Sequence, residues 1–308
     1  MSVFSRSTFS SVKYAHARPH YPATLVSRIL SYHGANSPRG SLIDIGCGPG
    51  TAAIAFSSKF DRIIGVDPSE RMISQTSSLS TTHPQMSFCV SPAEDLSLFN
   101  DAVFDMAVAG QSAHWFSNAA ALNEIARIVR RGGTFAFWGY NDNIIVSYPA
   151  ATAVFHDFLY RPNGEVAPGM HSMGRYWEQP GRGILRDYLE QVVLPQEHWS
   201  EVTREIYRPD LATCEVRPSD GEQHQGFWLQ KRMTLGEFEA YVRTYSAFSA
   251  WRDSNPQFVG RAEGGRGDII DVMMDRMREV TEAFNVDNWR EIEVDAVWGT
   301  VLVMAKKK

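Results

Sequence analysis

The feature that most constrains the fold is an alternation of short apolar runs with helix-like segments between residues 41 and 140. Such alternation is typical of parallel strands joined by crossover helices. The apolar runs predict five strands, at 41–46, 62–67, 86–91, 104–110 and 134–140. We therefore expect an α/β fold with a doubly wound, Rossmann-like sheet.

The segments between these strands predict helices at 51–58 and 69–78, and a third helix just before the last strand. The third helix carries an apolar stripe at helical spacing, formed by Leu122, Ile125, Ala126 and Val129. We expect this helix to end at Arg131, with Gly132 as its left-handed cap.

The alternation stops after Tyr140, where residues 141–198 are rich in proline, glycine and aromatic residues. We expect this segment to be an insertion over the ligand crevice. The remaining elements are two strands, at 201–207 and 291–306, and two helices, at 234–251 and 269–284.

The composition limits the classes of partner. The chain has 308 residues, of which 44% are hydrophobic, enough for one large domain. The formal charge is −5, and the only basic run is Lys306–Lys308, so no broad phosphate-binding face is visible. Nucleic acid is therefore not an expected partner, and we expect a monomer or a weak homodimer.

The cysteines and apolar stretches bear on the compartment. The three cysteines, Cys47, Cys89 and Cys214, are scattered and lack the C-x-x-C spacing of a zinc or redox pair, so no metal is expected. The N-terminus has no continuous apolar core of signal-peptide length, and no stretch approaches the length of a membrane span, about 18 apolar residues without charges. We expect a cytoplasmic protein that does not bind membranes.

A glycine-rich turn, "DIGCGPGTA" at 44–52, follows the first strand. Glycines here allow positive φ and a close approach of the backbone to a ligand. The spacing G-x-G-x-G differs from the dinucleotide fingerprint G-x-G-x-x-G. Asp67, at the end of the second strand, can accept hydrogen bonds from both hydroxyls of an adenosine ribose. Together the loop and the acid predict an adenosine-containing cofactor.

The run "LIDIGCGPG" at 42–50 resembles the first motif of the class I S-adenosylmethionine-dependent methyltransferases, which have a seven-stranded Rossmann-like sheet. The resemblance implies S-adenosyl-L-methionine as methyl donor and S-adenosyl-L-homocysteine as product. It implies that Asp44, Gly46, Gly48 and Gly50 surround the methionine part of the cofactor. It further implies that Asp67 takes the ribose, that Met72 packs on adenine, and that Ala93 and Glu94 lie near the adenine amine.

Further stretches resemble the fungal trans-aconitate methyltransferases and their small-molecule relatives. They are "YAHARPHYP" (14–22), "AHWF" (113–116), "WGYND" (138–142), "YWEQPGR" (176–182) and "YVRTYSA" (241–247). By this resemblance residues 1–308 are one methyltransferase domain. Its expected parts are a lid at 1–30, a cofactor-binding core at 41–140, a substrate cap at 141–198 and a C-terminal completion of the sheet at 199–308.

These stretches suggest roles for several side chains. Tyr14 and Arg18, four residues apart, suit a helical turn that closes over the cofactor carboxylate; plain packing on the sheet is the alternative. The expected substrate-binding residues for a carboxylated molecule are Tyr140, Trp177, Gln179, Arg182 and Arg186. For each arginine, a structural or surface salt bridge is an equal alternative. Arg243 is expected to be a solvated charge on an amphipathic helix, with a substrate contact as the weaker alternative.

His114 and Trp115 follow the fourth strand directly, where ligands of open α/β sheets bind, and are expected to be catalytic. Gln111 is expected near the methionyl group of the cofactor. A carboxylate acceptor is already ionised at pH 7 and needs no base, so His114 would orient and neutralise it. A phenol, an enol carbon or a protonated amine would need His114 as base. A packed core histidine is the third alternative.

The expected activity is methyl transfer to a small molecule, foremost O-methylation of a carboxylate such as trans-aconitate or a natural-product acid of secondary metabolism. Two other classes stay open: a dinucleotide oxidoreductase, which the glycine spacing disfavours, and a non-catalytic S-adenosylmethionine-binding protein. Methylation of nucleic acid is disfavoured because the fourth strand lacks the (D/N)-P-P-(Y/F) turn.

Overall fold

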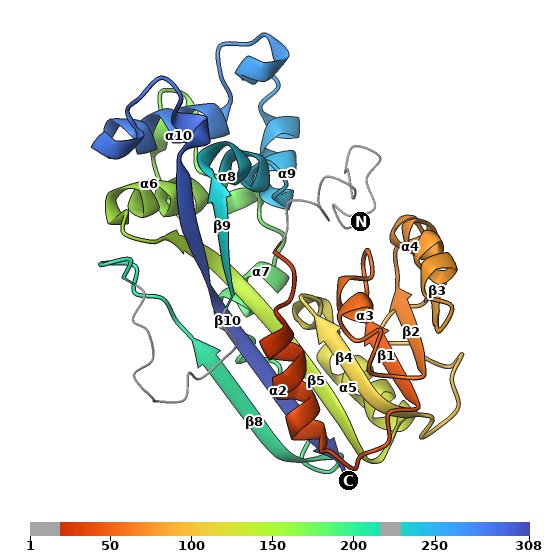
Figure 1. The fold of residues 1–308 in the computed structure, drawn as a ribbon. Coiled ribbons are helices and arrows are strands. Elements are labelled where there is room, and N and C mark those ends of the chain that lie inside the picture. The colour runs from red at the N-terminus through yellow and green to blue at the C-terminus, as the bar shows by residue number, and fades with distance from the viewer. Residues whose placement is uncertain (1–18, 216–228) are drawn as a thin grey trace.

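A computed structural model of the chain describes residues 19–215 and 229–308. Its centre is an eight-stranded sheet with strand order β3-β2-β1-β4-β5-β10-β8, and the eighth strand, β9, pairs with the start of β10, away from the stretch that pairs with β8 (Figure 1). The strands are β1 (Ser41–Ile45), β2 (Arg62–Asp67), β3 (Met86–Val90), β4 (Phe104–Gly110), β5 (Val129–Ile145), β8 (Trp199–Tyr207), β9 (Gln230–Thr234) and β10 (Glu293–Lys307). Strands β1–β5 run parallel, whereas β8, β9 and β5 pair antiparallel with β10.

The helices of the described residues are α2 (Ala23–His33), α3 (Thr51–Ala55), α4 (Glu70–Thr82), α5 (Asn118–Ile128), α6 (Pro149–Tyr160), α7 (Gly181–Arg186), α8 (Leu235–Val242), α9 (Ser246–Ser254) and α10 (Ile269–Glu279). Two short 3₁₀ segments, η2 (Ala113–Trp115) and η3 (Met173–Tyr176), matter for the site. A small hairpin, β6 (Glu165–Ala167) with β7 (Met170–His171), lies outside the main sheet.

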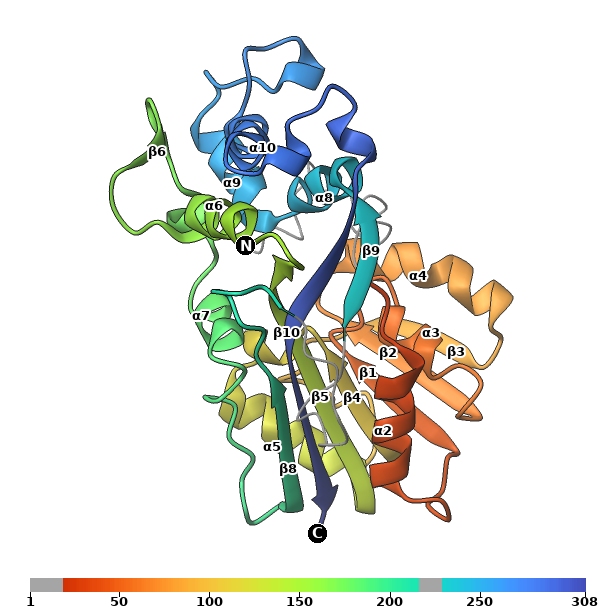
Figure 2. The same cartoon turned by 60° about the vertical axis from the view of Figure 1, so that its left-hand side comes forward.

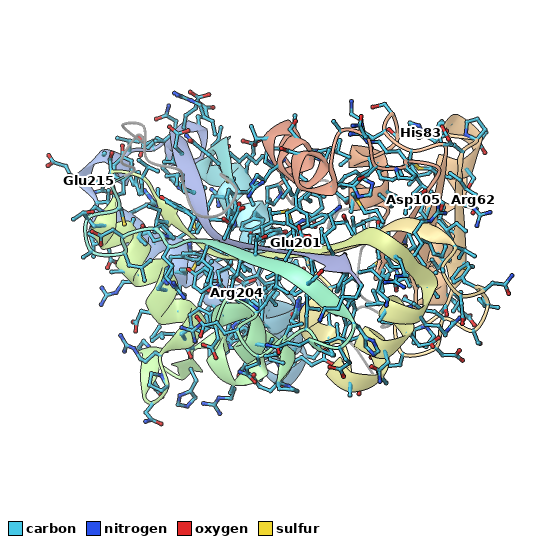
Figure 3. All side chains as sticks on the ribbon, turned by 90° about the horizontal axis from the view of Figure 1, so that it is seen from below. Arg62, His83, Asp105, Glu201, Arg204 and Glu215 are labelled. Atoms are coloured by element: carbon cyan, nitrogen blue, oxygen red, sulfur yellow. The ribbon has the colours of Figure 1, made fainter. Side chains whose placement is uncertain are left out.

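Apolar cores on both faces hold the sheet. Helices α2 and α3 cover one face and α5 and α7 the other (Figure 2). Neighbouring residues of β1 point to opposite faces, so Leu42 belongs to one core and Ile43 to the other. This is why the central parallel strands read as continuous apolar runs. Arg62 of β2 and Arg204 of β8 lie toward opposite ends of the strand order, as a view from below shows (Figure 3).

Strands β5 and β10 are much longer than the parallel strands. They pair from Ala296↔Ile145 to Lys306↔Thr134 and extend beyond the carboxyl ends of β1, β2 and β4. Helices α6, α8, α9 and α10 gather around this extension, above the sheet in Figure 1. The carboxyl edge of the parallel strands therefore faces a second layer, built from both 141–198 and the later helices.

The predicted strands are all present, and the doubly wound α/β class is confirmed. The predicted seven strands form the main path, and β9 is an eighth strand that the sequence reading missed. Its residues, "QKRMT", alternate only weakly and lie at an edge, so they lack the apolar pattern of a buried strand.

Several helix ends differ from the prediction: α3 ends at Ala55, α4 continues to Thr82 and α10 ends at Glu279. Two further differences have clear causes. Helix α5 ends at Ile128 because β5 begins at Val129, and Arg130 pairs with the buried Asp105 (2.8 Å) instead of capping a helix. Gly132 has the left-handed φ of +75°, but within an irregularity of β5. The predicted helix 234–251 is interrupted between α8 and α9, where the backbone of Tyr245 is extended.

The predicted lid at 1–30 also needs correction. Residues 1–18 lie outside the described part of the chain, but α2 begins at Ala23. Leu25 and Ile29 on this helix are fully buried, and α2 packs on β5 and β10. Residues 23–30 therefore belong to the core because their apolar face is covered by the sheet.

Arg243 was expected to be a solvated charge, and the structure contradicts this. It forms ion pairs with Glu239 (2.9 Å), Asp268 (2.6 Å) and Asp271 (2.7 Å), which join the end of α8 to the start of α10. The two aspartates are only 4% and 3% exposed. Burial raises the pKa of Asp271, but the backbone N–H groups of Arg261 and Asp268 and the Arg243 charge outweigh it, so the pKa is lowered.

We predict that Arg243→Ala lowers the free energy of unfolding by about 3 kcal/mol, because it leaves buried carboxylates without their cation. Since the Asp271 pKa is lowered, its stabilisation is present above its unfolded pKa of about 4 and is lost as the pH falls. The difference from wild type should therefore shrink in acid. Denaturant unfolding at pH 7 and pH 3.5 measures both effects.

The matched control is Arg252→Ala, which removes an exposed pair with Glu263 at 3.4 Å. It should change the free energy of unfolding by less than about 1 kcal/mol. Equal losses for Arg243→Ala and Arg252→Ala would contradict a structural role of the buried cluster.

Candidate functional site

Three neighbouring cavities lie at the carboxyl edge of the parallel strands. The large cavity has a volume of about 500 Å³, the small cavity about 70 Å³ and the arginine cavity about 320 Å³. The large and small cavities share Gln111, Trp115 and Tyr140 as lining residues. The small and arginine cavities share Trp177 and Arg182. The small cavity therefore lies between the other two, and a molecule bound in it would be next to whatever the large and arginine cavities hold.

The large cavity gathers most of the residues predicted to bind a cofactor. Those that line it are Asp44, Gly46, Gly48, Asp67, Met72, Ala93, Glu94 and Gln111. Gly50 is not among the lining residues; it has a φ of +84° and precedes α3, and an added Cβ would lie 2.6 Å from the Leu79 side chain. Tyr14 and Arg18 lie outside the described residues.

The glycine loop has the backbone that its sequence predicts. Gly46 and Gly48 have φ values of +68° and +51°. A Cβ on Gly46 would come within 2.5 Å of the Ser112 side chain, whereas one on Gly48 would meet no atom of the described residues within 4 Å. Gly46 thus allows a tight packing against the end of β4, and Gly48 leaves open space for a ligand.

Two carboxylates flank this loop. Asp67 accepts hydrogen bonds from the backbone N–H groups of Gly48 and Ser69, both at 2.9 Å, and burial raises its pKa. Asp44 accepts one from Ala53 N–H at 3.0 Å through Oδ2. Its Oδ1 is buried and has no partner among the described residues. Burial raises the pKa of the Asp44 carboxyl to about 7, with Asp67 adding to the rise.

Two predicted cofactor residues are partly or wholly engaged by the protein. One Glu94 oxygen accepts from Ser117 N–H at 2.6 Å, just before α5. The Gln111 side chain was expected near a methionyl group, but its amide makes two bonds to the backbone of Tyr140, at 3.0 and 2.9 Å. Gln111 therefore lines the large cavity while the nitrogen and the oxygen of its amide are both hydrogen-bonded to the backbone of Tyr140.

His114 and Trp115 lie on η2, directly after β4. His114 is 7% exposed and lines the small cavity, while Trp115 is 41% exposed and lines the large and small cavities. Burial, together with the charge of Arg182, lowers the pKa of His114 to about 3. The neutral imidazole is therefore favoured at pH 7, which argues against His114 as a neutralising cation, and its role in catalysis stays a prediction.

The small cavity is unusual in its unpartnered polar atoms. Within the described residues, four that line it have a buried polar atom without a hydrogen-bond partner: His114 Nδ1, Asn141 Oδ1, Trp177 Nε1 and Arg182 Nε. Two of these, the indole and guanidinium nitrogens, are obligate donors. Buried donors without partners are rare in folded proteins and call for a ligand or water.

Arg182 is the charge centre of this region. It pairs with Asp142 and with the Tyr160 hydroxyl, and its guanidinium lies 4.1 Å from the Trp177 ring centroid. Burial raises the pKa of the Asp142 carboxyl, but Arg182 outweighs it and holds the pKa below its usual range. The pair is therefore ionised.

The arginine cavity lies beside α7 and the β6–β7 hairpin. Its described lining contains Arg161, Arg175, Arg182 and Arg186 and no aspartate or glutamate. Arg161 and Arg182 have acidic partners, Asp157 and Asp142, whereas neither Arg175 nor Arg186 has one among the described residues. Gln179 also lines this cavity and accepts from Gly183 N–H at 3.1 Å. The cavity thus has a positive lining.

Sequence reasoning missed several lining residues of the small cavity: Asp142, Tyr241 and Tyr245. All three lie in quoted stretches, "WGYND" and "YVRTYSA". Tyr241 and Tyr245 are four residues apart and point to the cavity, whereas Arg243 between them forms the structural cluster. The aromatic pair at this spacing was the available signal. Gly181 in "YWEQPGR" also has a role, because an added Cβ would lie 2.6 Å from the Trp115 ring.

Among residues 19–215 and 229–308, no helix is long and apolar enough to cross a membrane. The same residues contain no cluster of three or more histidine, cysteine, aspartate or glutamate side chains arranged to hold a metal ion.

Comparison with known proteins gives a consistent family. Residues 43–137 match the family described as methyltransferase domain. CRG1 of Saccharomyces cerevisiae, named as an S-adenosylmethionine-dependent methyltransferase, is 27% identical over 305 residues, covering 97% of this chain and 96% of that protein. Methyltransferase pgmE of Aspergillus terreus is 26% identical over 67% of this chain and 65% of its own length.

The fold has a solved counterpart. The structure of a type II methyltransferase from Anaeromyxobacter dehalogenans superposes with a TM-score of 0.62 at 24% identity, covering 94% of this chain and 97% of that one. This likeness concerns the fold. The domain match and the full-length relative indicate an S-adenosylmethionine-dependent methyltransferase, and the solved counterpart shows the same fold.

Proposed function

We propose that the protein transfers a methyl group from S-adenosylmethionine in the large cavity to a carboxylate oxygen held in the small cavity. The body of the acidic substrate would extend into the arginine cavity. The observation that carries this proposal is the set of unpartnered donors, Trp177 Nε1 and Arg182 Nε, on residues that line the small cavity.

The large cavity fits the cofactor in its chemistry. The unpartnered Asp44 Oδ1 suits the α-ammonium group, and the open space at Gly48 suits close passage of the methionine part. Asp67 would accept from the ribose hydroxyls, while Met72 and Ala93 would pack on adenine and Glu94 would take its amine. When bound, the cofactor supplies an electrophilic methyl group on a sulfonium.

The acceptor group follows from the charge state of the small cavity. A carboxylate is ionised at pH 7, so methylation forms an O–CH₃ bond and breaks the S–CH₃ bond with no proton to remove. Burying that anion is costly unless donors meet it, and the indole and guanidinium N–H groups supply them. The chain's own task is then to hold the oxygen in line with the methyl group.

The pKa of His114 argues against the alternative with a protonated acceptor. A general base works best when its pKa lies near the working pH. Burial and Arg182 lower the pKa of His114 to about 3, which makes it a poor proton acceptor at pH 7. A neutral imidazole can still orient the acceptor through one ring nitrogen.

The arginine cavity supports an acidic substrate rather than a neutral one. Arg175 and Arg186 have no acidic partner among the described residues, and the cavity lining described contains no carboxylate to repel an anion. Gln179 and Trp177 would provide the remaining contacts. Trans-aconitate is one acid of this kind, and a natural-product acid of secondary metabolism is another.

Asp44 gives a test of the cofactor site. With its pKa raised to about 7, its stabilising contribution to the fold is full below its unfolded pKa of about 4 and is lost as the pH rises through 7. An ammonium group beside it lowers that pKa, so cofactor binding at pH 6 should release up to about one proton. Calorimetry in two buffers of different ionisation enthalpy measures this number.

Asp44→Asn should release about one proton fewer than wild type at pH 6 and should bind the cofactor at least about tenfold more weakly. The control Asp61→Asn changes an exposed acid outside the cavity and should behave as wild type. Equal proton release in Asp44→Asn and wild type would contradict the ammonium contact.

The acceptor is tested with methyl-labelled S-adenosylmethionine, trans-aconitate and a metabolite extract, with mass identification of the product. We expect a methyl ester, which alkali hydrolyses. Trp177→Phe should raise KM for the acid by about tenfold or more, because it removes a hydrogen bond to a charged group and keeps the ring.

Trp199→Phe is the matched control, since Trp199 Nε1 is also buried and unpartnered among the described residues but lines none of the three cavities. It should leave KM unchanged. A methyl ether, an N-methyl or a C-methyl product would exclude the carboxylate, and absence of any labelled product would favour a non-catalytic cofactor-binding protein.

A further inference from the structure

Gln111 has an unusual backbone and an unusual pair of side-chain bonds. It follows the last residue of β4 and has a φ of +55°, in the left-handed region that non-glycine residues seldom adopt. Its own N–H donates to Trp138 O at 2.9 Å. Its side-chain Nε2 donates to Tyr140 O at 3.0 Å, and its Oε1 accepts from Tyr140 N at 2.9 Å.

These bonds extend the hydrogen-bonded pairing of β4 with β5 by one residue. The parallel pairing of β4 with β5 ends at Gly110↔Trp138, so Tyr140 has no further β4 residue beside it. The Gln111 amide uses one N–H donor and its C=O acceptor to take the place of that missing peptide. Gly139 makes room for it, because an added Cβ there would lie 2.9 Å from Gln111 Oε1.

Tyr140 is the residue that this clamp fixes. It is buried and is one of three residues that line both the large and the small cavity. The centroid of its ring lies 6.4 Å from that of Trp298 on β10, in an edge-to-face arrangement. A shift of Tyr140 would therefore change the passage between methyl donor and acceptor, and misplacement by about 1 Å can cost about a hundredfold in rate.

We infer that Gln111 is a positioning residue for methyl transfer and not a ligand of the cofactor. It acts by fixing the backbone of Tyr140, so that the Tyr140 side chain is held at the junction of the two cavities. Both hydrogen bonds that the structure gives this amide go to Tyr140, which leaves one N–H of Nε2 outside the clamp. The Kd for S-adenosylhomocysteine tests whether that N–H contacts the cofactor. The inference rests on the methyltransferase activity and holds for any class of acceptor.

The test separates cofactor affinity from turnover. Gln111→Met removes both bonds at similar side-chain length, and Gln111→Glu keeps the acceptor for Tyr140 N–H. We expect Gln111→Met to lower kcat by about tenfold to a hundredfold, with Gln111→Glu in between. The Kd for S-adenosylhomocysteine, measured by titration calorimetry, should stay within about threefold of wild type because no cofactor contact is lost.

The matched control is Gln85→Met, which removes a side-chain bond to Ser57 O (3.0 Å) far from the cavities. It should leave kcat and Kd unchanged. Turnover is measured with trans-aconitate or, where that acid is not methylated, with the acceptor found in the extract. Failure of the carboxylate assignment therefore leaves this comparison intact.

A double-mutant cycle with Tyr140→Leu tests whether Gln111 affects kcat through the Tyr140 side chain. If Gln111 acts through Tyr140, Gln111→Met should change kcat by less than about twofold in the Tyr140→Leu background. Should Gln111→Met or Tyr140→Leu melt far below wild type, Gln111→Glu and Tyr140→Phe replace them in the cycle. A weaker Kd with unchanged kcat, behaviour equal to Gln85→Met, or additive effects in the cycle would each overturn the inference.

Discussion

The ion pair of Arg182 with Asp142 is the interaction on which the acceptor side of the molecule depends. It joins α7 to the extended part of β5, and the Tyr160 hydroxyl ties the same guanidinium to α6. Because Asp142 balances the charge, a guanidinium can be buried beside the small cavity without an uncompensated ion. Its remaining Nε–H and its positive potential act on that cavity, and the potential helps to keep His114 neutral.

The two halves of the site come from two kinds of strand. Short parallel strands, buried on both faces, end at one edge, and the turns after β1, β2 and β4 form the large cavity there. The long antiparallel pair of β5 and β10 rises past this edge and supports the helical layer that closes the acceptor side. Tyr140 lies on β5 where the two halves meet, which makes the geometry of this strand important for transfer.

Local motifs predicted which residues gather around the large cavity, since those residues are close together in sequence. The loop at Gly46 and Gly48 and the acid Asp67 lie within about twenty residues, and their positions depend on one strand–turn–helix unit. Gly50, in the same motif, serves the start of α3 and does not line the cavity. Neighbouring residues of one motif can thus have separate physical roles.

The acceptor side was harder to predict because its contacts span long sequence distances. Gln111 bonds to a residue 29 positions away and Arg182 to one 40 positions away, so neither partner follows from periodicity. Tyr241 and Tyr245 belong to the stretch "YVRTYSA", in which the sequence alone suggested a role only for Arg243. The neutral state of His114 depends on burial, which a single sequence does not report.

We propose that the acceptor loses no proton when it is methylated, and the pH dependence of kcat at saturating cofactor tests this claim. With the identified acceptor, kcat should stay level within about twofold from pH 6 to pH 9, since neither His114 nor a carboxylate titrates in this range. His114→Gln should retain that level profile. A kcat that rises about tenfold per pH unit through a pKa near 7, and loses this rise in His114→Gln, would contradict the claim.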